Sequence, residues 1–239
     1  MTEEQTPRFL LTAPKSGSGK TLVTCGILAA LRKRGLRVSS FKCGPDYIDP
    51  MFHSRVLGAK SRNLDTFFTD EETTRYLMKR GAEDTDISVV EGVMGYYDGL
   101  GGIDTKASAY DLAAVTGTPA VLVVDTRGMS LSALAEIKGF LTYKKESHIE
   151  GVILNRMSPM LYPEIKKQIE EELGIRVFGY VPKITELNLE SRHLGLVLPD
   201  EVKELSEKFD HLAEILEKSL DIDGLIGLAK EAEALECSE

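Results

Sequence analysis

Apolar residues along this chain fall into short continuous runs, which are separated by longer segments of helical periodicity. The runs are rich in Val, Ile and Leu and lack polar–apolar alternation, so we expect strands that are buried on both faces. The expected strands cover residues 9–13, 36–41, 86–92, 119–125, 151–155 and 176–181. Strands of this kind, alternating with helices, predict an α/β fold with a mainly parallel sheet and helices on both of its faces.

The periodic segments between these runs predict the helices. The expected helices cover residues 19–34, 70–80, 108–116, 130–143 and 162–173. Gly35 is expected to end the first of them, and Thr69 or Asp70 is expected to cap the second.

The pattern changes after Pro182. Loop and short elements are expected over residues 188–199, followed by an amphipathic helix over 201–220 and a short helix over 224–239. The sequence therefore predicts one main domain over residues 1–200 and a C-terminal helical extension over residues 201–239.

Composition narrows the classes of partner. The 239 residues are 42% hydrophobic, which is enough for a sizeable core, and carry a formal net charge of −9, which argues against general binding of nucleic acid or anionic membranes. No apolar run approaches the length that spans a bilayer, and the polar, acidic first eight residues show no secretory signal. The three cysteines are widely spaced. We expect a cytoplasmic protein with free thiols and with neither nucleic acid nor membrane as a partner.

The first apolar run ends in a small-residue turn that leads into a helix, which is the context of a phosphate-binding loop. Glycines let backbone N–H groups surround an anion, and the helix N-terminus adds its positive dipole end. Lys20 is expected to reach the terminal phosphates of a nucleotide, and the hydroxyl of Thr21 to bind Mg²⁺. The candidate nucleotide-binding residues are Lys15, Ser16, Gly17, Ser18, Gly19, Lys20 and Thr21.

This loop departs from the standard phosphate-binding pattern, because Pro14 stands where the pattern has glycine and Lys15 adds a second lysine. In this it resembles the variant P-loop of the dethiobiotin synthetase and partition-ATPase superclass. The resemblance implies a fold of the P-loop NTPase type. In that superclass the early lysine often reaches across a dimer, so a homodimer is expected, and whether Lys15 acts within its own subunit stays open.

Further candidate chemistry follows the second and third strands. Lys42, Asp46, Tyr47 and Asp49 lie in a turn-rich segment over residues 42–50, at the carboxyl end of a strand, where open parallel sheets bind ligands. The alternative is a polar loop without a chemical role.

Glu91 ends a buried strand, which is typical of the second half of a P-loop site. The glycine-rich residues 93–102 are interpreted as an active-site loop with Asp98 as a second candidate acid, and a surface hairpin is the alternative. For Asp125 a structural role at its strand end is favoured. The four histidines, His53, His148, His193 and His211, show no metal-ligand spacing and are expected to be structural or exposed, with His193 the best candidate for an exception.

Several motifs together resemble the synthetase half of the cobyrinic acid a,c-diamide synthase family. They are the P-loop Ser16–Thr21, Phe41–Asp49, Ser61–Asp65, Val90–Gly95, Tyr97–Gly99, Gly151–Arg156 and Glu190–Leu196. The resemblance runs from about residue 9 to residue 197. Gly-Pro-Asp-Tyr-Ile-Asp and Ser-Arg-Asn-Leu-Asp are more specific than the P-loop alone.

The resemblance implies an activity. Members of the family use ATP, Mg²⁺ and glutamine to convert two acetate side chains of a corrinoid to amides. ATP phosphorylates a substrate carboxylate, and ammonia then displaces phosphate from the acyl phosphate.

The resemblance also implies roles for individual residues. Lys42 would bridge the γ-phosphate and the attacking carboxylate, with Asp49 and Asp98 near the acyl phosphate and the ammonia. Thr21, Asp46 and Glu91 would hold Mg²⁺. Tyr47 and Arg62 would contact the macrocycle, and Asn155 would hydrogen-bond the base.

One departure from the family is expected at the C-terminus. Members normally continue into a glutaminase domain, which we expect to be absent here. The favoured interpretation is that the chain is the synthetase domain alone, and the alternative is that a separate glutaminase chain supplies the ammonia. Cys237 lies in an acidic tail without the context of a nucleophile. The alternatives to the leading reading are amidation of another tetrapyrrole, such as a nickel sirohydrochlorin, and a partition-type nucleotide switch ATPase. The sequence leaves open the central metal of the substrate and the order of the two amidations.

Overall fold

The strands in the described part of the chain form one parallel sheet. The computed structural model describes residues 5–184 and 199–237, with 199–203 described as backbone only. Seven strands pair in the order β3-β2-β4-β1-β5-β6-β7, and each neighbouring pair is parallel. The strands are β1 (Arg8–Thr12), β2 (Val38–Cys43), β3 (Lys60–Leu64), β4 (Ile87–Glu91), β5 (Ala120–Asp125), β6 (Ile149–Asn155) and β7 (Arg176–Val181). The predicted mainly parallel sheet is confirmed.

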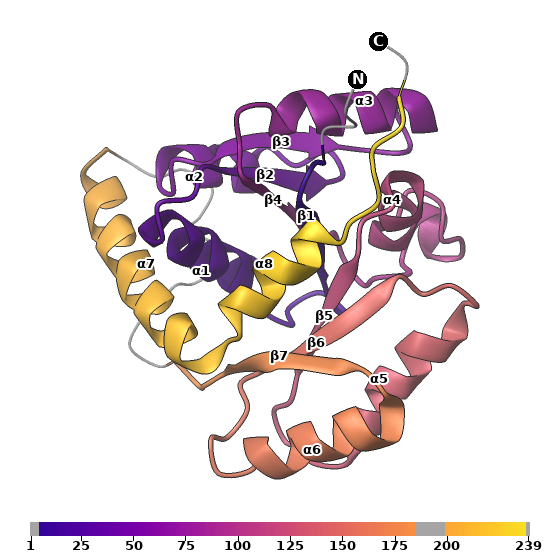
Figure 1. Ribbon diagram of the computed structural model, residues 1–239, viewed down its shortest axis with the longest axis vertical. Helices are drawn as coiled ribbons and strands as arrows, with labels where there is room; N and C mark the ends of the chain where they lie inside the picture. Colours follow the sequence, from indigo (N-terminus) through magenta and orange to yellow (C-terminus); the bar gives the residue numbers. More distant parts are fainter. Residues whose placement is uncertain (1–4, 185–198, 238–239) are drawn as a thin grey trace.

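Helices cover both faces of the sheet (Figure 1). They are α1 (Lys20–Lys33), α2 (Ile48–Arg55), α3 (Glu71–Ala82), the 3-10 helix η1 (Leu100–Gly102), α4 (Ala109–Thr116), α5 (Ser132–Tyr143), α6 (Tyr162–Leu173), α7 (Pro199–Ser219) and α8 (Ile222–Lys230). Successive side chains of β1 point to opposite faces, so Phe9 and Leu11 pack with α1, α2, α7 and α8, whereas Leu10 packs with α3 to α6. The two hydrophobic cores explain why the strands are continuous apolar runs.

The C-terminal helices are part of the first of these cores. Leu212 and Leu216 of α7 and Leu225 of α8 are fully buried. A Cβ atom on Gly26 of α1 would lie 2.4 Å from Leu216 Cδ1, so α7 approaches α1 more closely than a larger residue at position 26 would allow. Figure 1 shows α7 and α8 lying beside α1. The predicted helix over 201–220 is confirmed, and it completes the cover of one face of the sheet.

The structure corrects the sequence prediction after the second strand. Residues 36–41 were expected as the strand, but β2 ends at Cys43, so Lys42 lies within the sheet. Residues 42–50 were interpreted as a turn-rich segment, but Lys42 and Cys43 belong to β2 and α2 begins at Ile48. Pro50 lies in its first turn, where proline is tolerated because the first N–H groups have no partner within the helix.

Strand β3 was not predicted. Its sequence Lys-Ser-Arg-Asn-Leu has one apolar residue because it is an edge strand, partly exposed along most of its length. Helix α8 also differs from the prediction, since it ends at Lys230 and not at residue 239. The chain beyond α8 instead packs against the sheet domain, where Leu235 is buried and Arg75 Nε donates to Glu236 O. The predicted loop over 188–199 lies outside the described residues.

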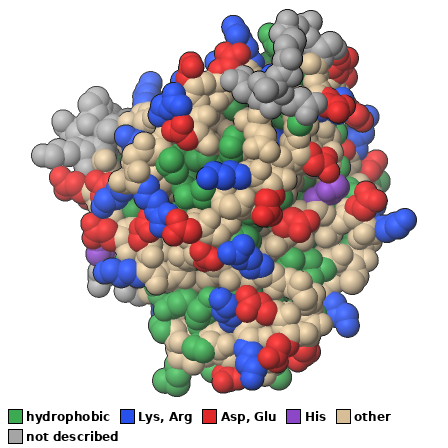
Figure 2. All heavy atoms as spheres, viewed as in Figure 1, with side chains coloured by type: hydrophobic (Ala, Val, Ile, Leu, Met, Phe, Trp, Pro, Cys, Tyr) green, Lys and Arg blue, Asp and Glu red, His purple; other side chains and the backbone are tan. Residues whose placement is uncertain are grey.

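The surface carries charges of both signs. Figure 2 shows acidic and basic side chains interspersed over one face of the molecule, with no continuous basic area on that face. None of the helices in the described part of the chain is both long enough and apolar enough to cross a membrane.

Arg8 joins the start of the sheet to the chain that follows α8. Its side chain is fully buried, and its guanidinium donates to Thr118 Oγ1 at 3.0 Å, Thr116 O at 2.5 Å and Glu233 O at 2.7 Å. Burial lowers the pKa of Arg8 to about 10. The side chain therefore satisfies carbonyl groups at the end of α4 and in the C-terminal segment with one buried cation.

Replacing Arg8 by leucine should destabilise the fold by about 3 kcal/mol, because the substitution leaves buried carbonyl groups without donors. Urea unfolding would measure the loss. Arg37→Leu is the matched control, since Arg37 is 65% exposed and pairs with Asp86 at the surface. A loss for Arg8→Leu no larger than that for the control would contradict the anchoring role of Arg8.

Candidate active site

The loop between β1 and α1 has the backbone geometry of a phosphate cradle. Gly17 and Gly19 adopt left-handed conformations, with φ of +78° and +91°. A Cβ atom at position 19 would lie 2.3 Å from Asn155 Nδ2, so both backbone conformation and space require glycine there. Ser18 Oγ donates to Lys15 O at 2.9 Å, a hydrogen bond that joins the two ends of the loop. The side chain of Lys15 itself is exposed.

Lys20 begins α1 and turns toward the loop that follows β4. Its Nζ donates to Met94 O at 2.5 Å and to Lys15 O at 3.5 Å, and only 8% of the residue is exposed. Burial lowers the pKa of Lys20 to about 8, although Glu91 opposes the shift. A buried lysine at the first turn of a helix behind a glycine loop is suited to hold an anion that restores its charge.

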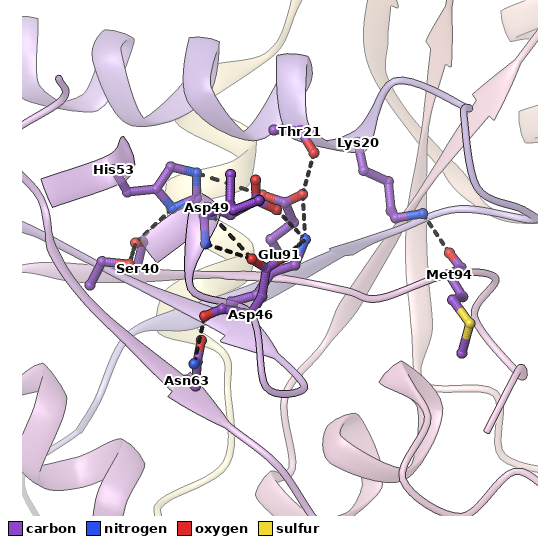
Figure 3. Close-up of polar contacts among 12 residues, drawn as sticks. Lys20, Thr21, Ser40, Asp46, Asp49, His53, Asn63, Glu91 and Met94 are labelled. Carbon is purple, nitrogen blue, oxygen red and sulfur yellow. Dashed lines mark hydrogen bonds and ion pairs between the residues drawn. The ribbon is translucent and has the colours of Figure 1, made fainter. Parts of the chain in front are cut away.

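A buried cluster of charged groups lies beside the P-loop (Figure 3). Lys42 Nζ lies 2.5 Å from Asp49 Oδ2 and 2.9 Å from Glu91 Oε1, and Thr21 Oγ1 donates to the same Glu91 oxygen at 2.6 Å. Burial alone would lower the pKa of Lys42, but Glu91 and Asp49 outweigh it and the pKa is raised. Lys42 therefore stays a cation at neutral pH, between a carboxylate from β4 and one from α2.

Of the three predicted Mg²⁺ ligands, the structure brings two into contact. Thr21 donates a hydrogen bond to Glu91. The carboxylate of Asp46 instead lies beside Lys42, with its Oδ2 4.0 Å from Lys42 Nζ. Asp46 Oδ1 accepts the backbone N–H groups of Ile48 and Asp49 at the start of α2. Asp46 is thus held by the N-terminus of the helix that carries Asp49.

These residues fit a magnesium ion. Glu91 Oε2 is buried and has no hydrogen-bond partner among the described residues. The Thr21 hydroxyl and the Lys42 ammonium contact the other oxygen of the same carboxylate, and the carboxylates of Asp46 and Asp49 lie beside Lys42. Among the described residues, no group of three or more His, Cys, Asp or Glu side chains could hold a metal ion. Mg²⁺ suits such a site because it commonly takes one or two carboxylates and completes its shell with phosphate oxygens and water.

Asp98 lies on the side of the site where Lys20 lies. Its carboxylate accepts the N–H of Gly95 at 3.0 Å and raises the pKa of Lys20, against the larger effect of burial. Asp49 instead contacts the Lys42 ammonium. The two predicted acids therefore have different partners, Asp98 beside Lys20 and Asp49 beside Lys42.

The two predicted macrocycle residues are also separated. Tyr47 is 85% exposed next to Asp46, at the rim of the charged cluster. In the sheet, Arg62 pairs in register with Phe41 of β2. The Arg62 side chain packs against Gly81 of α3. Lys42, the next residue of β2, faces the charged cluster.

Asn63, one residue further along β3, contacts the turn that precedes α2. Its Nδ2 donates to Asp46 O at 2.6 Å and holds the turn that carries Tyr47. Sequence analysis missed this role of Asn63 because β3 was not recognised. A strand over residues 60–64 would have placed residues 62 and 63 on opposite faces.

His53 was interpreted as structural or exposed, and the structure places it inside the site. It is fully buried on α2, its Nδ1 lies 3.0 Å from Ser40 Oγ, and its Nε2 lies 3.6 Å from Glu91 Oε2. Burial lowers the pKa of His53, so the imidazole is neutral at neutral pH. Since no sequence spacing links His53 to Glu91, this approach depends entirely on how α2 docks. The motif over residues 190–196, with His193, lies outside the described residues.

Comparison with known proteins identifies the family. A family model described as the CobQ/CobB/MinD/ParA nucleotide binding domain matches residues 9–197. The chain belongs to this family. Its P-loop, the buried Lys20 and the charged cluster are therefore parts of a nucleotide-binding domain.

Relatives confirm the resemblance drawn from the motifs. The chain is 43% identical over 234 residues to a cobyrinate a,c-diamide synthase from Listeria innocua, covering 97% of this chain and 52% of that protein. It is 42% identical over 222 residues to a hydrogenobyrinate a,c-diamide synthase from Mesorhizobium japonicum, covering 92% and 51%. The chain thus spans about half the length of the curated relatives it matches.

Solved structures confirm the fold. The septum site-determining protein MinD from Pyrococcus horikoshii, solved with Mg-ADP, superposes with a TM-score of 0.54 at 16% identity, covering 97% of both chains. Similarity at this level of identity shows the predicted P-loop NTPase type of fold and nothing about the substrate.

The depressed pKa of Lys20 predicts a pH dependence of nucleotide binding. The free protein loses the Lys20 charge as the pH rises through about 8. A bound phosphate favours the ammonium form, so binding should take up a proton, and affinity should fall between about pH 7.5 and 9. Calorimetry of ATP binding in two buffers with different ionisation enthalpies would measure the number of protons taken up.

The Lys20→Arg variant is the control. It should bind ATP more weakly and without this pH dependence, because a guanidinium stays charged. Wild-type affinity that is constant over the range would contradict the interpretation.

Proposed function

We propose that this chain uses ATP and Mg²⁺ to amidate the a- and c-acetate carboxylates of cobyrinic acid through an acyl phosphate. The observation that carries the proposal is the 43% identity to a cobyrinate a,c-diamide synthase over nearly the whole chain. The site supports it, because a cation between two carboxylates lies beside a phosphate-binding loop. Amidation by this route needs charge neutralisation where a phosphoryl group meets a carboxylate.

The residues of the cluster divide the first step between them. Lys20 and the P-loop amides bind the β- and γ-phosphates, and Lys42 neutralises charge between the γ-phosphate and the substrate carboxylate. Thr21, Asp46 and Glu91 would hold Mg²⁺, which supplies further neutralisation of the phosphates. A carboxylate oxygen forms a bond to the γ-phosphorus as the bond to the bridging oxygen breaks, and ADP leaves.

In the second step ammonia attacks the acyl carbon and phosphate leaves with the electrons of the broken C–O bond. The nitrogen must lose a proton as the amide forms, and Asp49 and Asp98 are the candidate acceptors. Asp49 is the better placed for a group held by Lys42, because its carboxylate contacts the Lys42 ammonium directly. Asp98, next to Lys20, would act at the phosphate side.

The nitrogen donor is proposed to be ammonia from a glutaminase domain or subunit. The hydrogenobyrinate relative, at 42% identity, favours a second candidate substrate, a corrinoid without cobalt. Amidation of another tetrapyrrole, such as a nickel sirohydrochlorin, is a further alternative. A homodimer and a cytoplasmic location stay predictions from the sequence, as does the assignment of Tyr47 and Arg62 to the macrocycle.

The proposal predicts amide products. Incubation of the protein with Mg-ATP, an ammonium salt and cobyrinic acid should give the monoamide and the diamide. Mass spectrometry would detect both products. A parallel reaction with glutamine would test whether nitrogen delivery needs a glutaminase. ATP binding without any amide product from cobyrinic or hydrogenobyrinic acid would overturn the proposal and favour a nucleotide switch.

Two variants test the roles within the site. Asp49→Asn should reduce amide formation by at least about 100-fold with little change in ATP affinity, because it removes a proton acceptor and not a phosphate ligand. Lys20→Ala should lose both amide formation and ATP binding. Asp84→Asn makes the same chemical change at an exposed aspartate before β4, at the opposite edge of the sheet, and should retain activity. Loss of ATP binding in Asp49→Asn would move Asp49 into the Mg²⁺ site, and normal turnover in Lys20→Ala would exclude the P-loop assignment.

A further inference from the structure

Helix α2 brings Asp49 to the charged cluster, although the helix has only eight residues. Its three buried residues, Asp49, Phe52 and His53, are spaced i, i+3 and i+4, so they lie on one face of the helix. A helix of this length is marginal by itself in water, so its contacts with the rest of the protein must hold it. The place of Asp49 therefore depends on what Phe52 and His53 contact.

Phe52 supplies the apolar contact of this face. Its ring is buried and packs edge-on against Phe209 of α7, with the ring centroids 5.4 Å apart. Apolar burial holds α2 against the core, but it is not directional. The rotation of α2 about its own axis must therefore be fixed by a directional contact.

His53 supplies a directional contact. It is fully buried, and its Nδ1 lies 3.0 Å from Ser40 Oγ, toward which the ring points in Figure 3. Ser40 Oγ in turn donates to Ser61 Oγ at 2.7 Å. Because a hydroxyl has one hydrogen and Ser40 gives it to Ser61, Ser40 Oγ accepts the hydrogen of His53 Nδ1. A chain of hydrogen bonds thus runs from α2 through β2 to β3.

Strand β3 anchors the segment at two points. Ser61 and Asn63 are alternate residues of the strand, so they lie on the same face of the sheet. Ser61 ends the chain of hydrogen bonds from α2, and Asn63 Nδ2 donates to Asp46 O, just before α2 begins. Asp49 lies between these two anchor points along the chain. The polar residues of the segment 61–65 thus hold the segment that carries Asp49.

The other ring nitrogen of His53 makes no hydrogen bond among the described residues. Nε2 lies 3.6 Å from Glu91 Oε2, which is too long for a hydrogen bond. The directional contact of His53 is therefore the one that Nδ1 makes with Ser40.

We infer that Ser40 and His53 are positioning residues that fix the rotation of α2 and so direct the Asp49 carboxylate to Lys42. The inference rests on the proposed function where it concerns the rate of amidation. The docking of α2 can be measured without any substrate.

Two amide side chains separate the roles of the two ring nitrogens. His53→Asn places an amide near the position of Nδ1 and can still bond Ser40, whereas His53→Gln places it near the position of Nε2. His53→Gln should lower kcat for amide formation by about 10-fold, because a small displacement of a reacting group costs rate. His53→Asn should keep kcat within about twofold of the wild type. Neither variant should change ATP affinity or the KM for cobyrinic acid. Full rate in His53→Gln, or equal losses in the two variants, would overturn the inference.

Adjacent serines of β2 form a matched pair. Ser40→Ala removes the partner of His53, whereas Ser39→Ala makes the same change at a buried serine that bonds Ser88 Oγ at 2.7 Å. Ser39 lies on the opposite face of the sheet, since neighbouring strand residues alternate. Ser40→Ala should raise hydrogen exchange about 10-fold in a peptide over residues 46–56 and leave β7 unchanged. Ser39→Ala should leave both peptides unchanged, and equal exchange over 46–56 in the two variants would contradict the docking role of Ser40.

A double variant tests whether His53 acts through Asp49. In the Asp49→Asn background, His53→Gln should reduce the remaining rate of amide formation no further, because both changes remove the same function. A further fall of about 10-fold would mean that His53 acts through another group, such as Glu91, and would overturn the inference.

The outcomes separate this inference from the proposed function. Wild-type protein that makes no amide would overturn the proposed function, and hydrogen exchange of the serine pair would still decide whether Ser40 and His53 dock α2. Amide formation by the wild type, with unchanged exchange over residues 46–56 in Ser40→Ala, would overturn the inference alone. If the His53 variants do not fold, the serine pair decides the inference.

Discussion

The ion pairs of Lys42 with Glu91 and Asp49 are the interaction on which the site depends. A buried ammonium is tolerated only where carboxylates compensate its loss of water, and removing one partner of such a group is costly. Lys42 and Glu91 are register partners on the neighbouring strands β2 and β4, so sheet pairing alone brings them together. Asp49 comes from α2, which therefore must dock where its first turn reaches Lys42. The charge cluster and the local fold require each other.

The P-loop is joined to this cluster from one side and to the end of β6 from the other. Thr21 hydrogen-bonds Glu91, and Lys20 reaches the loop after β4. On the opposite side Asn155 contacts the loop backbone. Strand β1 lies between β4 and β5 in the sheet, so the loop that follows it is flanked by the ends of both. This central place of β1 explains why side chains from β2, β4 and β6 and from the helices α1 and α2 converge at one edge of the sheet.

Much of the site was visible in the sequence because its residues follow apolar strands. The P-loop, the segment with Asp46 and Asp49, and Glu91 at a strand end were all identified before their distances were known, and the family they indicate is confirmed. His53 and Asn63 were missed for a common reason. Their contacts belong to α2 and β3, two short elements whose polar composition shows neither apolar runs nor clear periodicity. The contact of Asn155 with a base stays a prediction, and the structure shows that its Nδ2 also donates to Ser18 O of the P-loop.

The sequence by itself determined the parallel sheet, the order of most elements along the chain and the chemical nature of the site. These features depend on local periodicity, on glycines that permit a tight loop, and on motifs shared with relatives. Only the tertiary structure decided that Lys42 is a buried strand residue, that His53 approaches Glu91, and that the Arg62 side chain packs against α3. Strand register and helix docking fix which faces meet, and both are set by packing between residues far apart in the chain.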